Sequence, residues 1–313
     1  MSDDDQFLEY RPLLFSIAYR MLGAVSDAED AVQETFIRWH RSRQSGEPIH
    51  TPKGWLTTTL SRVCLDQLGS ARSKREHYIG PWLPEPLAGT TPDIAETVAD
   101  FDSLSLAFLV LLESLTPKER AVFLLHDVFA YDFASVGEIV GESNANCRQL
   151  AKRARAHISD RRPRFEAAPE QRELLTTRFL KAVSDGDLPA LIETLQDDVT
   201  LFSDGGGKVL AARKPVIGRE KVATFLTNIR RLAPEGTRFI AESISGAPGM
   251  IVLVDGAIQN VTTFDFGENG IRTIYSVLNP DKLQSIASAL SRTVVSQPAA
   301  GLVRLALRNE RSK

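Results

Sequence analysis

Apolar positions recur every three or four residues across the first quarter of the chain, which is the spacing of helices that bury one face. The period holds from residue 7 to residue 75, with a Gly- and Pro-containing loop near residues 46–52. Ser26 and Glu29 have the spacing of a capping box, which predicts a helix start at Ser26. A second strong helix is predicted from Trp55 to about residue 74. This part of the chain is therefore expected to be a helical bundle.

A second helical stretch covers residues 103–160. Thr116 followed by Pro117 is typical of a helix start, with Thr as the N-cap and Pro at the first helical position. Further on, a short apolar helix is interrupted at Gly141 and a new helix begins near Ser143, which is the outline of a helix-turn-helix. In the second of these helices, one face is apolar and the opposite face is basic and rich in amides.

The pattern changes to α+β between residues 170 and 283. Alternating apolar residues predict strands, and Asp255-Gly256 predicts a tight hairpin turn between two of them. The expected helices are 173–184, 188–195 and one beginning near 218; the expected strands are 199–202, 239–244, 250–254, 257–266 and 271–278. Residues 284–313 are weakly patterned and are treated as a tail.

Residues 76–102 separate the two helical stretches and read as a linker. Four prolines and two glycines forbid a continuous helix there, and six acidic residues occur without any Lys or Arg. The segment nevertheless contains Trp82, and we expect this indole to pack onto a neighbouring domain. The acidic residues are either a solvated polar face or a mimic of a nucleic-acid backbone, and the sequence favours neither.

Composition narrows the class of protein. The chain has 313 residues, of which 43% are hydrophobic and 25% charged, so it can form packed domains and wholesale disorder is excluded. The sequence shows neither a transmembrane run nor a secretory signal, and two distant cysteines suit a reducing cytoplasm, so we expect a cytoplasmic protein. The net charge is only -3, but residues 1–37 are acidic and residues 144–164 are basic. Such asymmetry indicates several partners, one of them a polyanion.

The two helical stretches resemble regions 2 and 4 of bacterial extracytoplasmic-function (ECF) sigma factors. The strongest likeness is the run from Asp27 to Phe36, which is similar to the helix that docks on the β′ clamp helices of core RNA polymerase. The family's WLxxI–R–D–R pattern falls on Trp55-Leu56, Arg62, Asp66 and Arg72. The resemblance implies that region 2 (7–75) binds core polymerase and the minus-10 element, and that the partners of the protein on the polymerase are the β′ clamp helices and the β subunit. It also implies that region 4 (103–164) reads the minus-35 element.

Residues 170–283 resemble a SnoaL-like domain, a cone-shaped α+β barrel. One subgroup of these sigma factors carries such a domain together with three short motifs, WLPEP, DGGGK and NPDKL, and all three occur here in order. The resemblance implies a multidomain fold with two all-α sigma domains followed by an α+β cone. It further implies that the C-terminal domain is a built-in regulator, so that a separate anti-sigma factor is not required.

Three groups of site residues follow. The acidic and amide residues expected to bind core polymerase are Asp30, Gln33 and Glu34. The residues expected to contact DNA are Arg62, Arg72, Arg75, Asn146, Arg148, Gln149, Lys152, Arg153 and Arg155. The residues expected to meet in an interdomain regulatory contact are Trp82, Leu83, Pro84, Glu85, Pro86, Asp204, Gly205, Gly206, Gly207, Lys208, Asn279, Pro280, Asp281, Lys282 and Leu283.

For the acidic and basic helix faces, the alternative interpretation is an ordinary solvated surface. Within the DNA-binding group, Arg148 and Gln149 are the candidates for reading bases, and the later basic residues suit phosphates. Trp55 is expected to pack in its own domain.

The DGGGK segment also admits other interpretations. It does not have the Walker A sequence, so a turning loop that touches the linker is favoured over a nucleotide site. The cone is a candidate site for a small-molecule ligand. All five histidines precede residue 160, so the C-terminal domain lacks an imidazole base, and only Asp204, Asp255, Asp265 or Tyr275 remain for catalysis. We therefore expect no enzyme, no cofactor and no metal.

The sequence thus predicts a sigma factor that directs promoter-specific initiation and is modulated by its own C-terminal domain. Two alternatives stay open. One is a one-component helix-turn-helix regulator with a ligand-sensing cone, and the other is a SnoaL-like isomerase or cyclase fused to a DNA-binding segment. The polymerase-docking helix favours the sigma factor, because neither alternative needs it.

Overall fold

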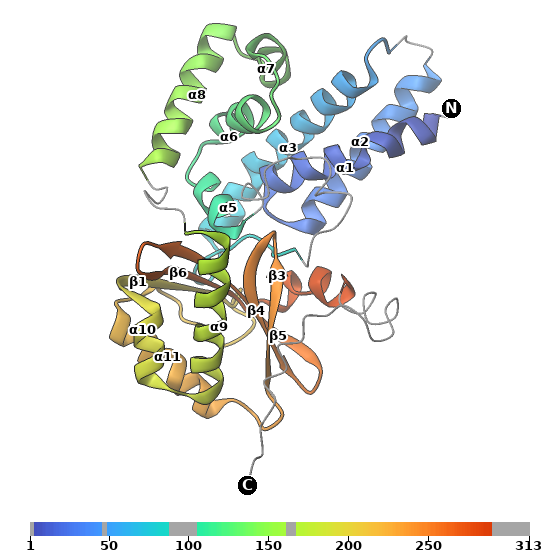
Figure 1. Ribbon diagram of the computed structural model, residues 1–313. Helices are drawn as coiled ribbons and strands as arrows, with labels where there is room; N and C mark the ends of the chain where they lie inside the picture. The colour runs from blue at the N-terminus through green and yellow to red at the C-terminus, as the bar shows by residue number, and fades with distance from the viewer. Residues whose placement is uncertain (1–2, 46–48, 88–104, 161–166, 290–313) are drawn as a thin grey trace. The chain divides into compact units, whose positions relative to one another are not determined.

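The computed structural model describes residues 3–45, 49–87, 105–160 and 167–289 (Figure 1). The chain divides into two units. The first is helical and contains residues 1–78 and 90–163, and the second contains residues 79–89 and 164–313. The second unit therefore includes the start of the predicted linker together with the C-terminal α+β domain.

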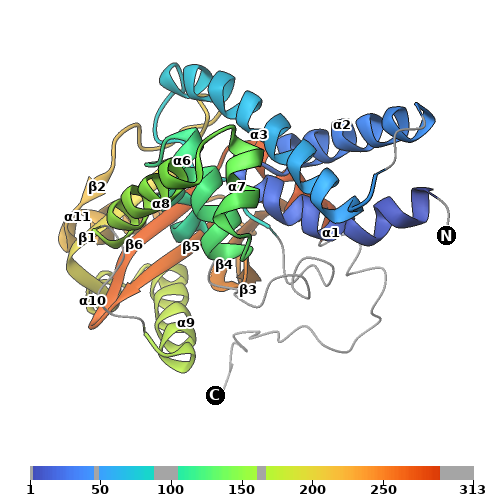
Figure 2. The same cartoon turned by 90° about the horizontal axis from the view of Figure 1, so that it is seen from above.

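The first helical group consists of α1 (Asp3–Leu22), α2 (Val25–Gln44) and α3 (Pro52–Glu76). The three helices pack against one another, as Figures 1 and 2 show. Trp39 is fully buried and meets Trp55 edge-on, with ring centroids 5.6 Å apart. The predicted packing role of Trp55 is confirmed.

The predicted capping box at Ser26 is wrong. Helix α2 begins at Val25, its N-cap is Ala24, and no side chain caps it. The cause lies in the preceding connection: α1 ends at Leu22 and Gly23 takes a positive φ of 75°. A left-handed glycine after a helix reverses the chain at once, so Ser26 already lies inside the next helix.

The second helical group consists of α5 (Leu106–Leu112), α6 (Pro117–Phe123), the π-helix η2 (Leu124–Val128), α7 (Phe133–Val140) and α8 (Asn144–Ser159). Thr116 and Glu119 form a complete capping box at the start of α6. Gly141 ends α7 in the left-handed conformation, and the Ser143 side chain caps α8. The helix-turn-helix is therefore built as predicted, with Asp132 as the additional cap of α7.

The C-terminal domain contains α9 (Pro169–Asp185), α10 (Leu188–Thr194), α11 (Arg219–Leu232) and a six-stranded sheet. The strands are β1 (Leu195–Asp204), β2 (Val216–Ile217), β3 (Arg238–Ile244), β4 (Ala247–Val254), β5 (Ala257–Gly267) and β6 (Gly270–Val277). Their order is β2-β1-β6-β5-β4-β3, and β1 with β6 is the parallel pair among otherwise antiparallel neighbours. The expected α+β class is confirmed.

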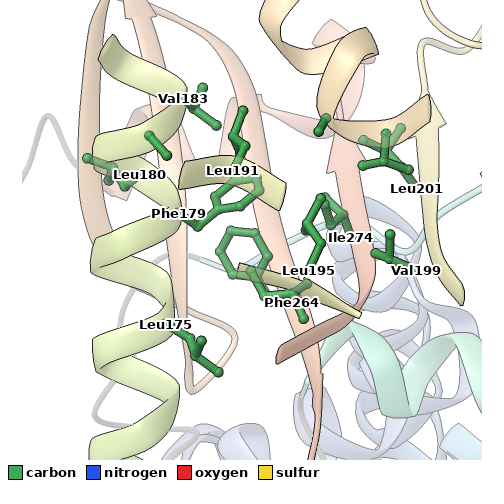
Figure 3. Packing of buried hydrophobic residues seen from close by; sticks show 14 of the residues in the cluster. Leu175, Phe179, Leu180, Val183, Leu191, Leu195, Val199, Leu201, Phe264 and Ile274 are labelled. Atoms are coloured by element: carbon green, nitrogen blue, oxygen red, sulfur yellow. The ribbon is translucent and has the colours of Figure 1, made fainter. Parts of the chain in front are cut away.

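The core of this domain lies between the sheet and the helices (Figure 3). Phe179 on α9 meets Phe264 on β5 with ring centroids 4.9 Å apart. Leu191, Leu195 and Ile274 are also almost completely buried there. Asp204 is the last residue of β1 and pairs with Val277 of β6, so the sheet fixes its position.

Three hairpins connect β3 to β4, β4 to β5 and β5 to β6, and the turns of the first two have similar backbone angles. Asp255-Gly256 joins β4 to β5 with φ values of 50° and 82°, as predicted. Ser245-Gly246 joins β3 to β4 with similar values, 51° and 78°. Two successive positive φ angles match a type I′ turn, which suits the twist of a hairpin.

Candidate functional site

The first candidate site gathers the three predicted motifs around the carboxylate of Asp204, which is fully buried. Its Oδ2 accepts hydrogen bonds from the Leu83 amide at 2.9 Å and from the Lys282 ammonium at 2.7 Å. Its Oδ1 accepts one from the Gly206 amide at 3.1 Å. A buried carboxylate is stable only with such partners, and here they come from WLPEP, NPDKL and DGGGK.

Lys282 ties the same motifs together from the other side. Its ammonium also donates to the Leu83 carbonyl at 2.5 Å and lies 4.2 Å from the centre of the Trp82 ring. The contact with Trp82 is a cation–π interaction. Lys282 belongs to a short 3₁₀ helix, η3 (Pro280–Lys282), whose N-cap is Asn279. The NPDK turn therefore aims this ammonium at the linker.

A second anchor lies four residues further along the linker. The Leu87 amide donates to the Ser245 hydroxyl at 3.0 Å, and the Ser245 amide donates to the Leu87 carbonyl at 2.9 Å. Ser285 also donates to the Pro86 carbonyl at 3.4 Å. We call the contacts of residues 82–87 with Asp204, Ser245 and Lys282 the linker clip. All of them lie within the second unit.

The glycine loop of DGGGK packs against the linker because its glycines have no side chains that would block the close approach. A Cβ on Gly205 would lie 2.7 Å from the Val209 carbonyl oxygen, so the loop closes only with glycine there. Gly206 and Gly207 have positive φ angles of 60° and 72°. A Cβ on Gly207 would meet the side chain of Ile79 at 2.8 Å, which places the linker directly on the loop.

The remaining motif residues lie nearby. Lys208 forms an exposed ion pair with Asp281. The linker motif is buried at Leu83, Pro84, Glu85 and Pro86, and Leu283, which follows η3, is also buried. The structure thus brings the three motifs together. Sequence reasoning missed Leu87 and Ser245, although the Ser245-Gly246 dipeptide is a readable turn signal.

The second candidate site is the acidic surface of α2. Asp30 and Gln33 are exposed, and Glu34 is half-buried and pairs with Arg38 at 2.8 Å. Ile37 lies one turn further along the helix and is 37% exposed. The exposed apolar side chain of Ile37 therefore lies one helical turn from the acidic and amide groups of this surface.

The third candidate site is the outer face of α8. Cys147, Leu150, Ala151, Ala154 and Ile158 are buried, as the sequence predicted. Five of the predicted DNA-binding residues on α8 are exposed, namely Arg148, Gln149, Lys152, Arg153 and Arg155, and Arg148 lies 5.7 Å from the Phe133 ring centre. Three residues of the group have partners within the helical unit: Asn146 donates to Glu142, Arg153 pairs with Glu119 and Arg155 pairs with Asp127.

The predicted DNA contacts of α3 have a different outcome. Arg62 donates to the backbone carbonyls of Glu138 and Ile139 at the end of α7. The side chains of Arg72 and Arg75 lie outside the described residues, although α3 runs through both positions. Arg62 therefore contacts the second helical group in this structure.

The four groups considered for catalysis do not form one cluster, although Asp265 and Tyr275 lie on neighbouring strands. Asp204 belongs to the linker clip, and Asp255 is an exposed turn residue. Burial raises the pKa of the Tyr275 hydroxyl. Burial also raises the pKa of the Asp265 carboxyl, although the hydrogen bond from Arg272 acts to lower it. Residues 265 and 275 lie on neighbouring strands and are in electrostatic contact. Residues 164–313 contain no histidine, because every histidine of the chain precedes residue 160.

None of the helices in the described ranges is both long and apolar enough to cross a membrane. The same ranges hold no cluster of three or more His, Cys, Asp or Glu side chains placed for a metal ion.

Known proteins with similar sequences and structures define the class. Residues 7–74 match Sigma-70 region 2, and residues 105–158 match Sigma-70, region 4. The chain is 36% identical to ECF RNA polymerase sigma factor SigJ of Mycobacterium tuberculosis strain H37Rv, over 88% of this chain and 92% of SigJ. It is 32% identical to the probable ECF RNA polymerase sigma factor SigI of the same species, over 90% of this chain and 94% of SigI.

The crystal structure of Mycobacterium tuberculosis SigJ superposes with a TM-score of 0.72, covering 90% of this chain and 98% of that one at 33% identity. The two helical groups are thus those of a sigma factor, α1–α3 forming region 2 and α5–α8 forming region 4. The chain belongs to the ECF RNA polymerase sigma factors.

Proposed function

We propose that this sigma factor binds core RNA polymerase through the acidic surface of α2 and reads promoter DNA through the outer face of α8. The observation that carries the proposal is the helix-turn-helix, whose second helix exposes Arg148, Gln149 and Lys152 over a buried apolar stripe. Basic and amide side chains on such a helix suit phosphates and base edges in a major groove. The protein acts in the cytoplasm, where polymerase and promoter meet.

The C-terminal domain acts as a regulator of this activity and not as an enzyme. Support comes from the linker clip, which fixes residues 82–87 to the domain through Asp204, Ser245 and Lys282. The linker connects region 2 to region 4, so a domain that holds it controls how the two DNA-reading regions are joined. Since the regulator is part of the chain, no separate anti-sigma factor is required.

The polymerase-binding role is tested with Gln33→Ala/Glu34→Ala. We expect the double variant to lose at least 20-fold in affinity for core polymerase, a loss of about 1.8 kcal/mol, because it removes the amide and a carboxylate of the docking surface. The control is Glu9→Ala/Gln44→Ala, which changes two exposed polar residues elsewhere on α1 and α2. Binding of the first variant within a few-fold of wild type would contradict the assignment.

The regulatory role is tested by promoter-specific transcription in vitro with Trp82→Ala and Trp82→Phe. The phenylalanine keeps an aromatic face for the Lys282 ammonium, and the alanine removes it. We expect Trp82→Ala to change initiation at least fivefold, and Trp82→Phe to stay within twofold of wild type. Equal activities of the two variants would contradict regulation through the clip.

If the wild-type protein binds promoter DNA but does not initiate transcription with core polymerase, the one-component regulator would be supported instead.

A further inference from the structure

Strand β3 is an open edge of the C-terminal sheet. The strand order places it at one end, and in the part of the chain that the structure describes no strand lies beyond it. Its residues from Phe239 to Ser243 are all partly exposed, and the contact of the linker with Ser245 lies beyond the end of the strand. The opposite edge, β2, has only two residues, and a very short edge strand protects a sheet against pairing with other chains. Strand β3 has seven residues and lacks this protection.

The hairpin that joins β3 to β4 decides which backbone groups of β3 face outward. Ile244 and Ala247 flank its two-residue turn, and in such a hairpin the flanking residues exchange both of their hydrogen bonds. Hydrogen-bonded pairs then alternate along the ladder, whose register is unbroken over residues 238–244. The N–H and C=O groups of Phe239 and Ala241 therefore point away from β4, toward the open edge.

The side chains of β3 do not block this edge. The strand contains no proline, and no bulge interrupts its pairing with β4. Its two charged residues, Arg238 and Glu242, are four positions apart, so both side chains lie on the same face of the sheet, with Ile240 between them. The Glu242 carboxylate accepts a hydrogen bond from the Ser243 amide at 3.1 Å. Because this amide also points outward, the carboxylate lies at the open edge.

We propose that β3 is an interaction surface for a second copy of this chain, and that the two β3 strands pair antiparallel with Ile240 at the centre. A two-fold axis makes every contact between the copies reciprocal. In this register Phe239 of each copy lies opposite Ala241 of the other, and their outward backbone groups form hydrogen bonds. Arg238 of each copy lies opposite Glu242 of the other, on the same face, so the dimer contains two cross-strand pairs of opposite charge.

Charge selects this register among its neighbours. If the centre moves to Phe239, Arg238 lies opposite Ile240, and if it moves to Ala241, Glu242 lies opposite Ile240. Both shifted registers place a charged side chain opposite an apolar one, whereas the register centred on Ile240 pairs opposite charges and places Ile240 opposite its own copy. The sequence of β3 is therefore complementary to itself. This proposal does not depend on the function proposed above.

Sedimentation velocity of the full-length chain measures this association. Pairing of two edge strands buries less surface than the roughly 1,200 Å² of a standard interface, so we expect a weak dimer that forms as the concentration rises to about 200 μM. Arg238→Glu and Glu242→Arg each place like charges opposite each other in both cross-strand pairs. Either change should weaken the dimer at least about tenfold.

A mixture of these two variants is the most specific test. When one Arg238→Glu copy meets one Glu242→Arg copy, both cross-strand pairs again carry opposite charges, so association should return to within about threefold of wild type. A role of either residue within its own copy would not produce this recovery. Arg231→Glu and Glu220→Arg make the same changes of charge at exposed positions of α11, and these control variants should associate like wild type.

Ala241→Pro tests the backbone contact separately. Proline lacks the outward N–H, and an edge strand accepts proline where this group does not bond its own sheet. We expect this variant to fold and to lose the association. The charge variants keep every backbone group, so they decide the question even if the proline variant does not fold. A wild type that stays monomeric up to about 200 μM, single charge variants that associate like wild type, or a mixture that stays monomeric would each overturn the proposal.

Discussion

A single side chain, the ammonium of Lys282, links three segments that are far apart in the sequence. It is 8% exposed and contacts Asp204, the Leu83 carbonyl and the Trp82 ring. The second ion pair between the same two motifs, Lys208 with Asp281, has both side chains more than half exposed. Water screens the exposed pair and not the buried one, so the two pairs should differ sharply in their effect on stability.

Replacing Lys282 with Met should therefore destabilise the C-terminal domain by about 3–5 kcal/mol, because the Asp204 carboxylate would stay buried without its cation. The measurement is urea unfolding of the full chain. Lys208→Met serves as the matched control and should cost about 0–1 kcal/mol. Adding Asp204→Asn to Lys282→Met should recover part of the loss, since no charge is then buried. Equal effects of the two Lys→Met changes would contradict this account.

At the scale of elements, the sequence predicted those helix ends that are determined by nearby residues. Caps at Thr116 and Ser143 and the left-handed break at Gly141 placed the helix-turn-helix, because each of these residues satisfies or redirects its own backbone. Ser26 failed as a cap since Gly23 had already turned the chain. Strand β2 has only two residues and escaped prediction, because two residues cannot show a period.

The candidate sites divide in the same way. Motif residues of the linker clip were found by resemblance, and the apolar stripe and basic face of α8 were found by helical spacing. The contacts of Arg62 with α7 and of Ser245 with Leu87 were not predictable, because they join residues 76 and 158 positions apart. Neither period nor propensity carries information over such separations.

The N-cap of α7 provides a pH-dependent test at this scale. Hydrogen bonds from the Ser135 amide, then from its hydroxyl and from the Ala134 amide, hold the pKa of Asp132 below its usual value of 3.8. A lowered pKa in the folded state means that the carboxylate stabilises the fold above that usual value. The contribution is lost as the pH falls through the lower folded-state pKa.

Wild type and Asp132→Asn should therefore diverge with pH. Asparagine caps helices without titrating, so its contribution does not change between pH 7 and pH 2.5. We expect the melting temperature of wild type relative to the variant to fall steadily below about pH 4. A difference that stays constant over this range would show that the Asp132 carboxylate does not favour the folded state.

For the whole molecule, the linker has two anchors on the C-terminal domain that differ in kind. Leu83 is held by the buried carboxylate of Asp204, whereas Leu87 is held by a neutral hydroxyl on a hairpin turn. The Ser245 hydroxyl accepts a hydrogen bond from the Leu87 amide, and the Ser245 amide donates one to the Leu87 carbonyl. Two hydrogen bonds therefore join the linker to the β3–β4 turn. If the domain regulates through the linker, the hydrogen bonds of both anchors must be formed in the free chain. Replacing Asp204 or Ser245 should then weaken the hydrogen bond of the linker amide that it holds.

Hydrogen exchange at the Leu83 and Leu87 amides measures the two anchors separately. Ser245→Gly removes the acceptor of the Leu87 amide and suits the positive φ of 51° at this position. We expect the Leu87 amide to exchange roughly fivefold to tenfold faster, the equivalent of a hydrogen bond of about 1 kcal/mol. Leu83 should be unchanged, because Asp204 and Lys282 are untouched. Equal acceleration at both amides would mean that the linker is released as one cooperative unit, and fast exchange at both in wild type would mean that the clip is open in the free sigma factor.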